Sequence, residues 1–185
     1  MKKVTLLGDS IRLYGYGPLV PALLGEDVEV FQPDENCRFA KYTLRGFNEW
    51  RSKIAGSDVI HFNCGIWDAG DVLGDGKLFS SDEEYVETIL RIAKCALRVT
   101  PKVIFATTTP VNPAYVSVDN EDIDRFNALV VPKLLSLGVE INDLHSLVAA
   151  DLAGNICEDK LHLSELGAER CAEQVAKVIR ARLDE

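Results

Sequence analysis

Short apolar stretches rich in β-branched residues alternate along the chain with longer segments of helical periodicity. The apolar stretches predict strands at Lys3–Leu7, Val28–Phe31, Asp58–Asn63, Lys102–Thr107 and Val139–Asn142. The other segments predict helices at Leu19–Leu24, Ala40–Ile54, Ser81–Val99, Asn120–Leu137 and Ser164–Leu183. Alternation of this kind is typical of βαβ units around a parallel sheet. We therefore expect an α/β fold of the flavodoxin-like kind, a doubly wound three-layer sandwich with a five-stranded parallel sheet.

Several helix ends carry recognisable signals. Ser81 with Glu84 three residues later predicts a capping box at the start of one helix. Asn120, followed by two acidic residues, predicts the start of the next. Pro101 and Gly138 mark the points where helices end before the fourth and fifth strands.

Two connections are longer than the framework requires. Gly65–Ser80 is rich in glycine and aspartate, and its composition fits either a lid over a site or a solvated surface insertion. Thr108–Asp119 contains two prolines that prevent a helix from starting at once, and we expect it to form one wall of a pocket.

Polar residues gather where the predicted strands end. Ser10 follows the first strand, and Asn63 ends the third. Asn36 and Cys37 follow the second strand. Ligands of open parallel sheets bind outside the carboxyl ends of the strands, so this edge is where we expect the chemistry.

Composition narrows the class of protein. A chain of 185 residues can form one sizeable core, and we expect a single domain over residues 1–185. A formal net charge of −9 argues against nucleic acid or an anionic membrane as partner and favours a small-molecule substrate.

Targeting signals and disulfides are not expected. Gly8 and Asp9 interrupt the first apolar run too early for a signal peptide, and no apolar stretch is long enough to span a membrane. The cysteines are odd in number, scattered and without a Cys-x-x-Cys pair; they are Cys37, Cys64, Cys95, Cys157 and Cys171. We expect free thiols and a cytoplasmic location.

The C-terminal part of the chain offers a base for nucleophilic catalysis. A serine hydroxyl attacks only when a base takes its proton and a third group orients that base. His162 follows Asp159 by three residues in a turn before a helix, which can place the carboxylate against the imidazole. Ser10 lies in Gly8-Asp9-Ser10, where the glycine permits a tight turn after a buried strand. Taken alone, a Gly-Asp-Ser tripeptide more often forms a turn or caps the N-terminus of a helix than supplies a nucleophile.

Asn63 supplies a further element at the same edge. Acyl transfer places negative charge on a carbonyl oxygen, and fixed donors near that oxygen accelerate the reaction. An asparagine amide at the end of a strand suits this role, although it also serves to satisfy loop backbone groups.

These blocks, in identity and order, resemble the SGNH hydrolases, also called the GDSL esterase/lipase family. The matching residues are Gly8-Asp9-Ser10, Asn63 and Asp159-Lys160-Leu161-His162, which together span nearly the whole chain. The resemblance implies that Ser10 is the nucleophile, His162 the general base and acid, and Asp159 the residue that orients it. It also implies an oxyanion hole made by the Ser10 N–H and the Asn63 amide, and no metal or cofactor.

The sequence departs from the family at two places. The third block lacks the usual glycine before Asn63 and aspartate after it. The loop after the second strand has no glycine to supply a backbone donor, so by position we expect the N–H of Cys37 to complete the oxyanion hole.

Other polar residues near this edge are candidates for substrate contact or structure. We expect substrate contacts from Asp9, Arg12, Trp67 and Asp68. His61 is expected to be a hydrogen-bonded strand-end histidine, and His145 a loop or helix-start residue. Cys64 is expected to be a small buried residue rather than a nucleophile.

Together these patterns predict a carboxylester hydrolase acting through an acyl-enzyme on short acyl esters, with acetylated sugars as the first candidate. Three alternatives stay open. The same triad serves lysophospholipases and thioesterases, it can transfer the acyl group to an alcohol, and the sheet can support a non-catalytic binding domain.

Overall fold

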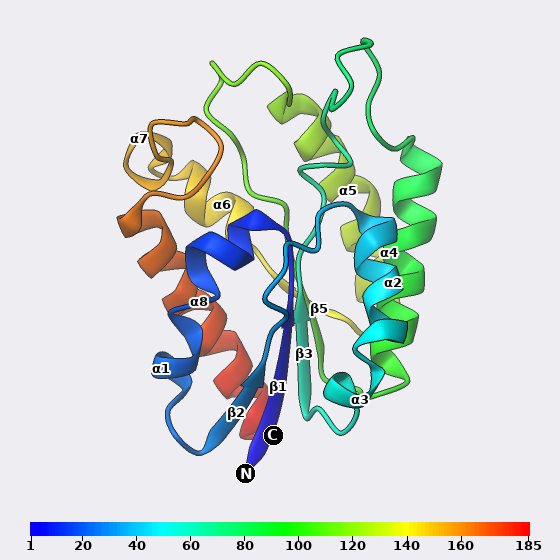
Figure 1. Ribbon diagram of the computed structural model, residues 1–185, viewed down its shortest axis with the longest axis vertical. Helices are drawn as coiled ribbons and strands as arrows, with labels where there is room; N and C mark the ends of the chain where they lie inside the picture. The colour runs from blue at the N-terminus through cyan, green and yellow to red at the C-terminus, as the bar shows by residue number, and fades with distance from the viewer.

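Five parallel strands form one central sheet in the computed structural model, which describes residues 1–185 (Figure 1). The strands are β1 (Lys2–Leu7), β2 (Val28–Phe31), β3 (Val59–Phe62), β4 (Val103–Ala106) and β5 (Glu140–Asn142). Their order across the sheet is β2-β1-β3-β4-β5, and Val4 of β1 pairs with Val30 of β2 on one side and Val59 of β3 on the other. The predicted α/β doubly wound fold with a five-stranded parallel sheet is confirmed.

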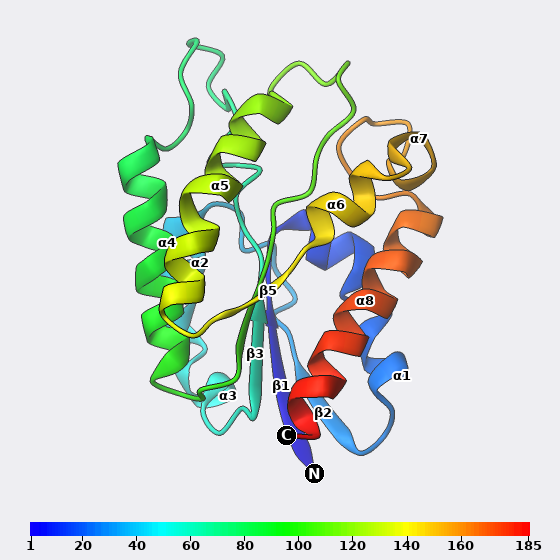
Figure 2. The ribbon, with the colours of Figure 1, turned by 180° about the vertical axis from the view of Figure 1, so that it is seen from behind.

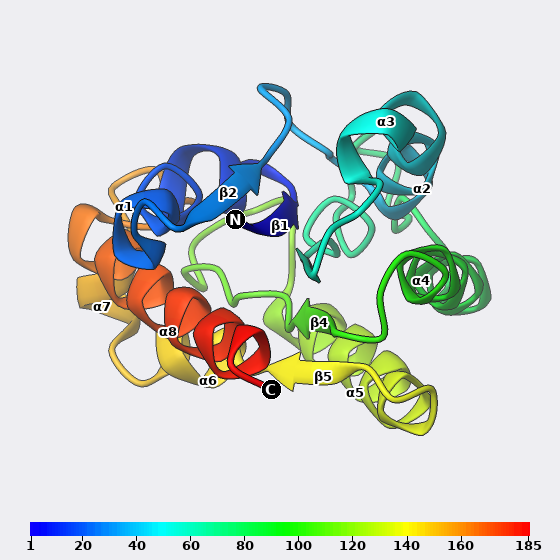
Figure 3. The same ribbon diagram turned by 90° about the horizontal axis from the view of Figure 1, so that it is seen from below.

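Helices cover both faces of the sheet, as the view along the strands shows (Figure 3). One face carries η1 (Ile11–Tyr16), α1 (Val20–Leu24), α6 (Leu144–Ala149), α7 (Leu152–Asn155) and α8 (Glu165–Leu183). The other carries α2 (Ala40–Glu49), α3 (Arg51–Ile54), α4 (Asp82–Leu97) and α5 (Asn120–Ser136). Seen from behind, α8 crosses one face and α4 and α5 lie side by side on the other (Figure 2). No helix combines the length and apolar character that crossing a lipid bilayer requires.

Helices bury both faces of the two inner strands β3 and β4, which explains why these strands are almost entirely apolar. β3 and β4 are buried at every position. Side chains alternate between faces, so Ile104 packs toward α8 whereas its neighbour Phe105 packs toward α4 and α5. The two cores therefore fix which side chains of each strand face which layer of helices.

The local signals were accurate at most helix ends. The capping box at α4 is confirmed, because Ser81 Oγ accepts from the Glu84 N–H (3.2 Å) while the Glu84 carboxylate accepts from the Ser81 N–H (3.2 Å). The cap of α5 is Asp119, one residue earlier than predicted, because the Asn120 amide instead bonds both backbone groups of Val111.

Some short elements differ from the prediction. Ala40–Ile54 is two helices, α2 and α3, because the backbone leaves the helical conformation at Trp50 (φ −98°, ψ 19°). The brief helices η1, α6 and α7 were not predicted, since each is too short to show helical periodicity.

Candidate active site

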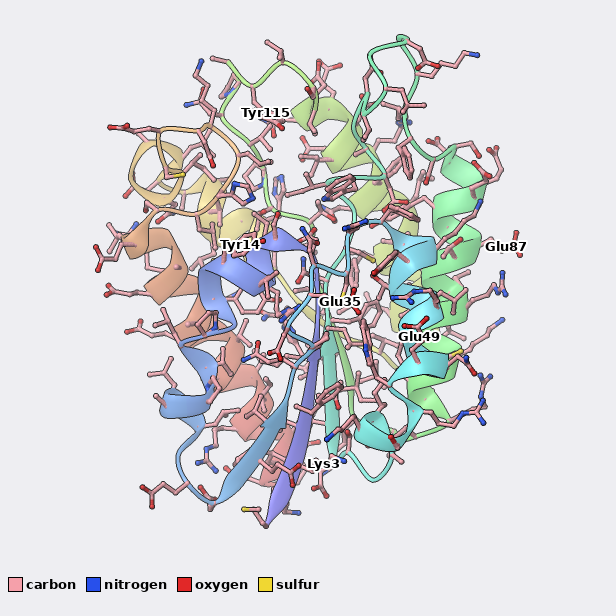
Figure 4. The ribbon with its side chains drawn as sticks, viewed as in Figure 1. Lys3, Tyr14, Glu35, Glu49, Glu87 and Tyr115 are labelled. Carbon is pink, nitrogen blue, oxygen red and sulfur yellow. The ribbon has the colours of Figure 1, made fainter.

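The carboxyl ends of the strands open into a cavity of about 340 Å³ that Ser10 and His162 both line. Ser10 lies three residues after Leu7, the last residue of β1, and directly precedes η1, and only 8% of it is exposed. The remaining lining residues are Tyr14, Asn36, Ile66, Trp67, Gly70, Val72, Tyr115, Ser117, Val118 and Leu161. Tyr14 and Tyr115, from η1 and from the loop before α5, lie at the same end of the molecule (Figure 4). The fold thus brings Ser10 and His162, which are 152 residues apart in the sequence, to one cavity.

His162 is held by Asp159, three residues before it. The imidazole Nδ1 lies 2.7 Å from Asp159 Oδ2, while Asp159 Oδ1 accepts from the backbone N–H groups of Leu161 and His162, both at 2.9 Å. Partial burial acts to raise the pKa of Asp159, but these three hydrogen bonds outweigh it and hold the pKa well below its ordinary value. The carboxylate is therefore ionised and fixes Nδ1 of His162 as the protonated nitrogen, which leaves Nε2 free to accept a proton.

Asn63 directly follows β3, and its amide is held by two partners. Nδ2 donates to Asp9 Oδ1 (2.9 Å), and Oδ1 accepts from the Tyr16 hydroxyl (2.6 Å). The amide is almost completely buried, with 5% of the residue exposed. The second Nδ2 hydrogen has no acceptor in the protein.

Both long loops contribute residues to the cavity wall. Residues 65–80 contribute Ile66, Trp67 and other residues at the start of the loop, whereas Leu73 nearer its tip is 77% exposed. Gly70 pairs with Val118 in an antiparallel bridge that ties this loop to the one before α5. The prediction that residues 108–119 wall a pocket is confirmed. The start of the 65–80 loop lines the cavity and its tip is exposed to solvent, as expected for a surface insertion.

Sequence comparisons give no match, whereas structural comparison gives many. No family model and no curated protein matches the sequence. The lipase/acylhydrolase from Enterococcus faecalis superposes with a TM-score of 0.80 at 19% identity, covering 98% of this chain and 97% of that chain. A member of the lipolytic protein G-D-S-L family from Veillonella parvula superposes with a TM-score of 0.76 at 19% identity, covering 97% and 99% of the two chains. The chain has the SGNH hydrolase fold.

Two structures with the SGNH fold come from enzymes that act on acetylated carbohydrates. An acetylxylan esterase from Geobacillus stearothermophilus superposes with a TM-score of 0.81 at 15% identity, covering 96% of this chain and 94% of that chain. Its catalytic mutants replace a serine, an aspartate and a histidine by alanine. Est24, a carbohydrate acetylesterase from Sinorhizobium meliloti, superposes with a TM-score of 0.76 at 14% identity, covering 98% and 99% of the chains.

Cys37 does not have the position expected of an oxyanion donor in this SGNH fold. Its N–H donates to the carbonyl of Gly8 (3.1 Å), and its side chain is fully buried, which raises the pKa of the thiol. The prediction for Cys37 is wrong because this N–H already ties the loop after β2 to the turn before Ser10. The neighbouring Asn36 lines the cavity, and its backbone N–H has no acceptor within the protein.

Arg12 is a structural residue rather than a substrate contact. It is 1% exposed, and its guanidinium donates to the carbonyls of Pro33 (2.8 Å) and Glu35 (2.7 Å), with a longer bond to Gly8 (3.3 Å). The predicted substrate contact is wrong because these backbone carbonyls occupy the guanidinium. Arg12 therefore joins the loops that follow β1 and β2.

Asp9 and Asp68 are also buried away from the cavity, so the substrate contacts predicted for them are wrong. Asp9 accepts from Asn63 and from the Ile11 N–H (3.0 Å), and burial raises its pKa to about 6 against these bonds. Asp68 accepts from the Ala40 N–H (2.9 Å) and the Ser80 hydroxyl (2.7 Å), and burial raises its pKa to about 6. Asp68 thus joins both ends of its loop to the start of α2. Of the four predicted contacts, only Trp67 lines the cavity.

The remaining histidines and Cys64 have the structural roles expected of them. Asn142 donates to His61 Nε2 (3.2 Å), and burial lowers the pKa of His61 to about 3, so it is neutral. His145 lies in the first turn of α6, with Nε2 2.9 Å from Asp124 Oδ1. Cys64 is fully buried, which raises the pKa of its thiol well above the ordinary value. All five cysteines are free.

No role in the site was predicted for Tyr14, Tyr16 or Tyr115, and Asn36 was predicted only to lie at this edge of the sheet. Tyr14 and Tyr16 lie in η1, which begins immediately after Ser10, and proximity to Ser10 was the one available signal. Tyr115 lies in the loop that was itself predicted to wall the pocket. No group of three or more His, Cys, Asp or Glu side chains has an arrangement that could hold a metal ion.

Proposed function

We propose that this chain is a serine ester hydrolase in which Ser10, His162 and Asp159 act together. The observation that carries the proposal is that Ser10 and His162, from opposite ends of the sequence, line one cavity while Asp159 orients the imidazole. A surface Asp-x-x-His pair has no reason to share a cavity with the serine of a strand-end turn. The SGNH fold, found also in acylhydrolases and acetyl esterases, supports the same conclusion.

The chemistry follows from the protonation state of His162. Nε2 takes the proton of Ser10 as Oγ adds to the ester carbonyl, and the imidazolium is stabilised by the ionised Asp159. The tetrahedral intermediate collapses, and the leaving alkoxide takes the proton from Nε2. A water molecule then adds to the acyl-enzyme with His162 again as base, which releases the carboxylic acid and restores Ser10.

The negative oxygen of the intermediate needs donors at the edge of the sheet. The Ser10 N–H lies at the N-terminal end of η1, where backbone donors lack helical acceptors, and Asn63 has one free amide hydrogen. We assign the third donor to the unbonded N–H of Asn36, in place of Cys37. All three residues lie in loops that follow neighbouring strands.

The cavity favours a short acyl group on a ring-shaped alcohol. Its walls carry the aromatic residues Tyr14, Trp67 and Tyr115, whose faces can stack on a sugar ring. A volume of about 340 Å³ suits an acetyl ester of a monosaccharide unit better than a long fatty acyl chain. We therefore propose acetylated carbohydrates as the substrate class.

The direct test is turnover of p-nitrophenyl acetate by the wild type, by Ser10→Ala and by the control Ser52→Ala, whose serine is exposed on α3. The proposal expects Ser52→Ala to match the wild type and Ser10→Ala to lose at least about 10³-fold in kcat. Equal rates for the wild type and Ser10→Ala contradict it. A parallel screen of acetylated xylose and p-nitrophenyl palmitate tests the substrate class, which fails if the long-chain ester is the better substrate.

A further inference from the structure

The carboxamide of Asn63 is enclosed by the segment that follows β1. The hydroxyl of Tyr16 donates to Oδ1 (2.6 Å), and Asp9 Oδ1 accepts from Nδ2 (2.9 Å). On a further side lies the bare backbone of Gly8, where a Cβ atom would fall 2.1 Å from Asn63 Oδ1. Tyr16 is fully buried and does not line the cavity, so its hydroxyl bonds to Asn63 and does not contact a ligand in the cavity.

These partners determine which way the amide faces. An ionised Asp9 can only accept, so the NH₂ group must face Asp9 and the carbonyl oxygen must face the Tyr16 hydroxyl. Because the amide is planar, fixing both of its ends also fixes the direction of the second Nδ2 hydrogen. That hydrogen is the one left for a ligand.

Tyr16 also strengthens the donor it positions. A hydroxyl that donates to Oδ1 withdraws electron density from the amide, and linked hydrogen bonds in a buried network polarise one another. The Nδ2 hydrogen that is not bonded to Asp9 then becomes a better donor to a negative oxygen. The effect is greatest when charge is fully developed, which is the transition state.

We propose that Tyr16 is a positioning residue of the oxyanion hole, acting through Asn63 without touching the substrate. The inference rests on the proposed function and extends it to a residue outside the cavity. η1 makes it possible, since its backbone departs from helical geometry at Gly15 (φ −96°, ψ −105°), next to Tyr16. The hydroxyl of Tyr16 thus reaches the end of β3 from the segment that begins with the nucleophile.

The first test is Tyr16→Phe, which keeps the ring and removes only the hydroxyl. The account expects kcat for p-nitrophenyl acetate to fall about tenfold with KM changed less than about twofold, the equivalent of one hydrogen bond lost in the transition state. The matched control is Tyr85→Phe, because Tyr85 is equally buried but donates to the carbonyl of Cys64 (2.8 Å). Tyr85→Phe is expected to keep the wild-type kcat; an equal fall in both variants assigns the effect to packing and overturns the proposal.

A double-mutant cycle separates positioning from a general structural effect. If Tyr16 acts through Asn63, then Tyr16→Phe has no further effect on kcat in the Asn63→Ala background. Rates are normalised to the fraction of molecules that a fluorophosphonate can label, so that only folded, reactive protein is counted. The inference is overturned if the two substitutions lower kcat by independent, multiplicative factors.

A measurement on the unsubstituted protein covers the case in which Tyr16→Phe does not fold. With ¹⁵N-labelled asparagine, the side-chain NH₂ of Asn63, assigned through Asn63→Ala, is expected to give two separate proton signals protected from exchange with water. An Asn63 NH₂ that exchanges as fast as an exposed asparagine contradicts the pinned orientation.

The outcome for the wild type distinguishes this inference from the proposed function. An inactive wild type that also resists the fluorophosphonate overturns the proposed function, and the positioning role of Tyr16 falls with it. An active wild type, an inactive Ser10→Ala and an unaffected Tyr16→Phe leave the proposed function standing and overturn the role of Tyr16 alone.

Discussion

Asp159 contacts His162 twice: its Oδ2 lies 2.7 Å from the imidazole Nδ1, and its Oδ1 accepts the backbone N–H of the same residue at 2.9 Å. The carboxylate therefore fixes both the turn that carries the histidine and the tautomer of its ring. A contact within three residues needs no distant part of the fold, which is why the sequence spacing alone could predict it.

Asp159→Asn tests the tautomer. The asparagine Oδ1 can keep the two backbone bonds, but its NH₂ then faces Nδ1 and favours the form in which Nδ1 accepts and Nε2 is protonated. A protonated Nε2 cannot take the proton of Ser10, so we expect kcat to fall about 10³–10⁴-fold with the fold intact. Steady-state kinetics with p-nitrophenyl acetate measures this, and circular dichroism checks the fold. Glu158→Gln, a change at the exposed neighbouring carboxylate, is the control and is expected to retain full activity.

Arg12→Met tests the structural assignment of this arginine. The substitution keeps much of the side-chain volume but leaves the carbonyls of Pro33 and Glu35 without their donor. We expect the free energy of unfolding to fall by about 3 kcal/mol, measured by urea denaturation. The exposed Arg91→Met is the control and is expected to change stability by less than about 0.5 kcal/mol. A full-stability Arg12→Met variant with weakened substrate binding would instead restore the substrate-contact role.

Asp68→Asn tests how much the ionisation of the buried Asp68 carboxyl lowers the free energy of unfolding. Burial raises the pKa of Asp68 from 3.8 to about 6, so the native state holds this proton more tightly than the unfolded state. The stability contributed by Asp68 therefore falls as pH rises from about 4 to about 6. Asparagine can accept from the Ala40 N–H and donate to Ser80 without ionising.

We expect the free energy of unfolding of Asp68→Asn, minus that of the wild type, to increase as pH rises from about 4 to about 6. The increase is up to about 3 kcal/mol. Urea denaturation of both proteins at pH 4, 5, 6 and 7 measures it. A difference that is constant across these pH values, or that declines with pH, contradicts the raised pKa.

Trp67→Ala tests the aromatic wall. If Trp67 stacks on the alcohol part of the substrate, KM for an acetylated xyloside rises about tenfold, because the lost contact is present in both the ground and transition states. Hydrolysis of free p-nitrophenyl acetate changes much less, since its acyl group and reacting carbonyl do not depend on that wall. Equal losses for both substrates indicate that Trp67 only supports the loop.

The fold could be predicted because the sheet is buried on both faces. β3 and β4 are buried at every position and are apolar except for His61, and the helix between them carries a capping signal that acts within a few residues. Ser10 and Asn63 could be placed at one edge because they follow neighbouring parallel strands, whose carboxyl ends meet there. Their joint position follows from topology rather than from any single motif.

The misassigned residues share a physical cause, which is that their partners are distant in sequence or are backbone atoms. Arg12 bonds to the carbonyls of Pro33 and Glu35, and the N–H of Cys37 bonds to Gly8. Neither partner has a side-chain identity that a sequence pattern could show. Asp68 was misread for the same reason, since it accepts from the backbone of Ala40 across the sheet edge.

The central claim, that Ser10 is an activated nucleophile, is tested most directly by labelling the native protein with a fluorophosphonate and mapping the adduct by mass spectrometry. Trypsin releases Val4–Arg12, in which Ser10 is the only serine. We expect a single adduct on this peptide, absent in Ser10→Ala. A folded wild-type protein that stays unlabelled, or one labelled only on another residue, would contradict it.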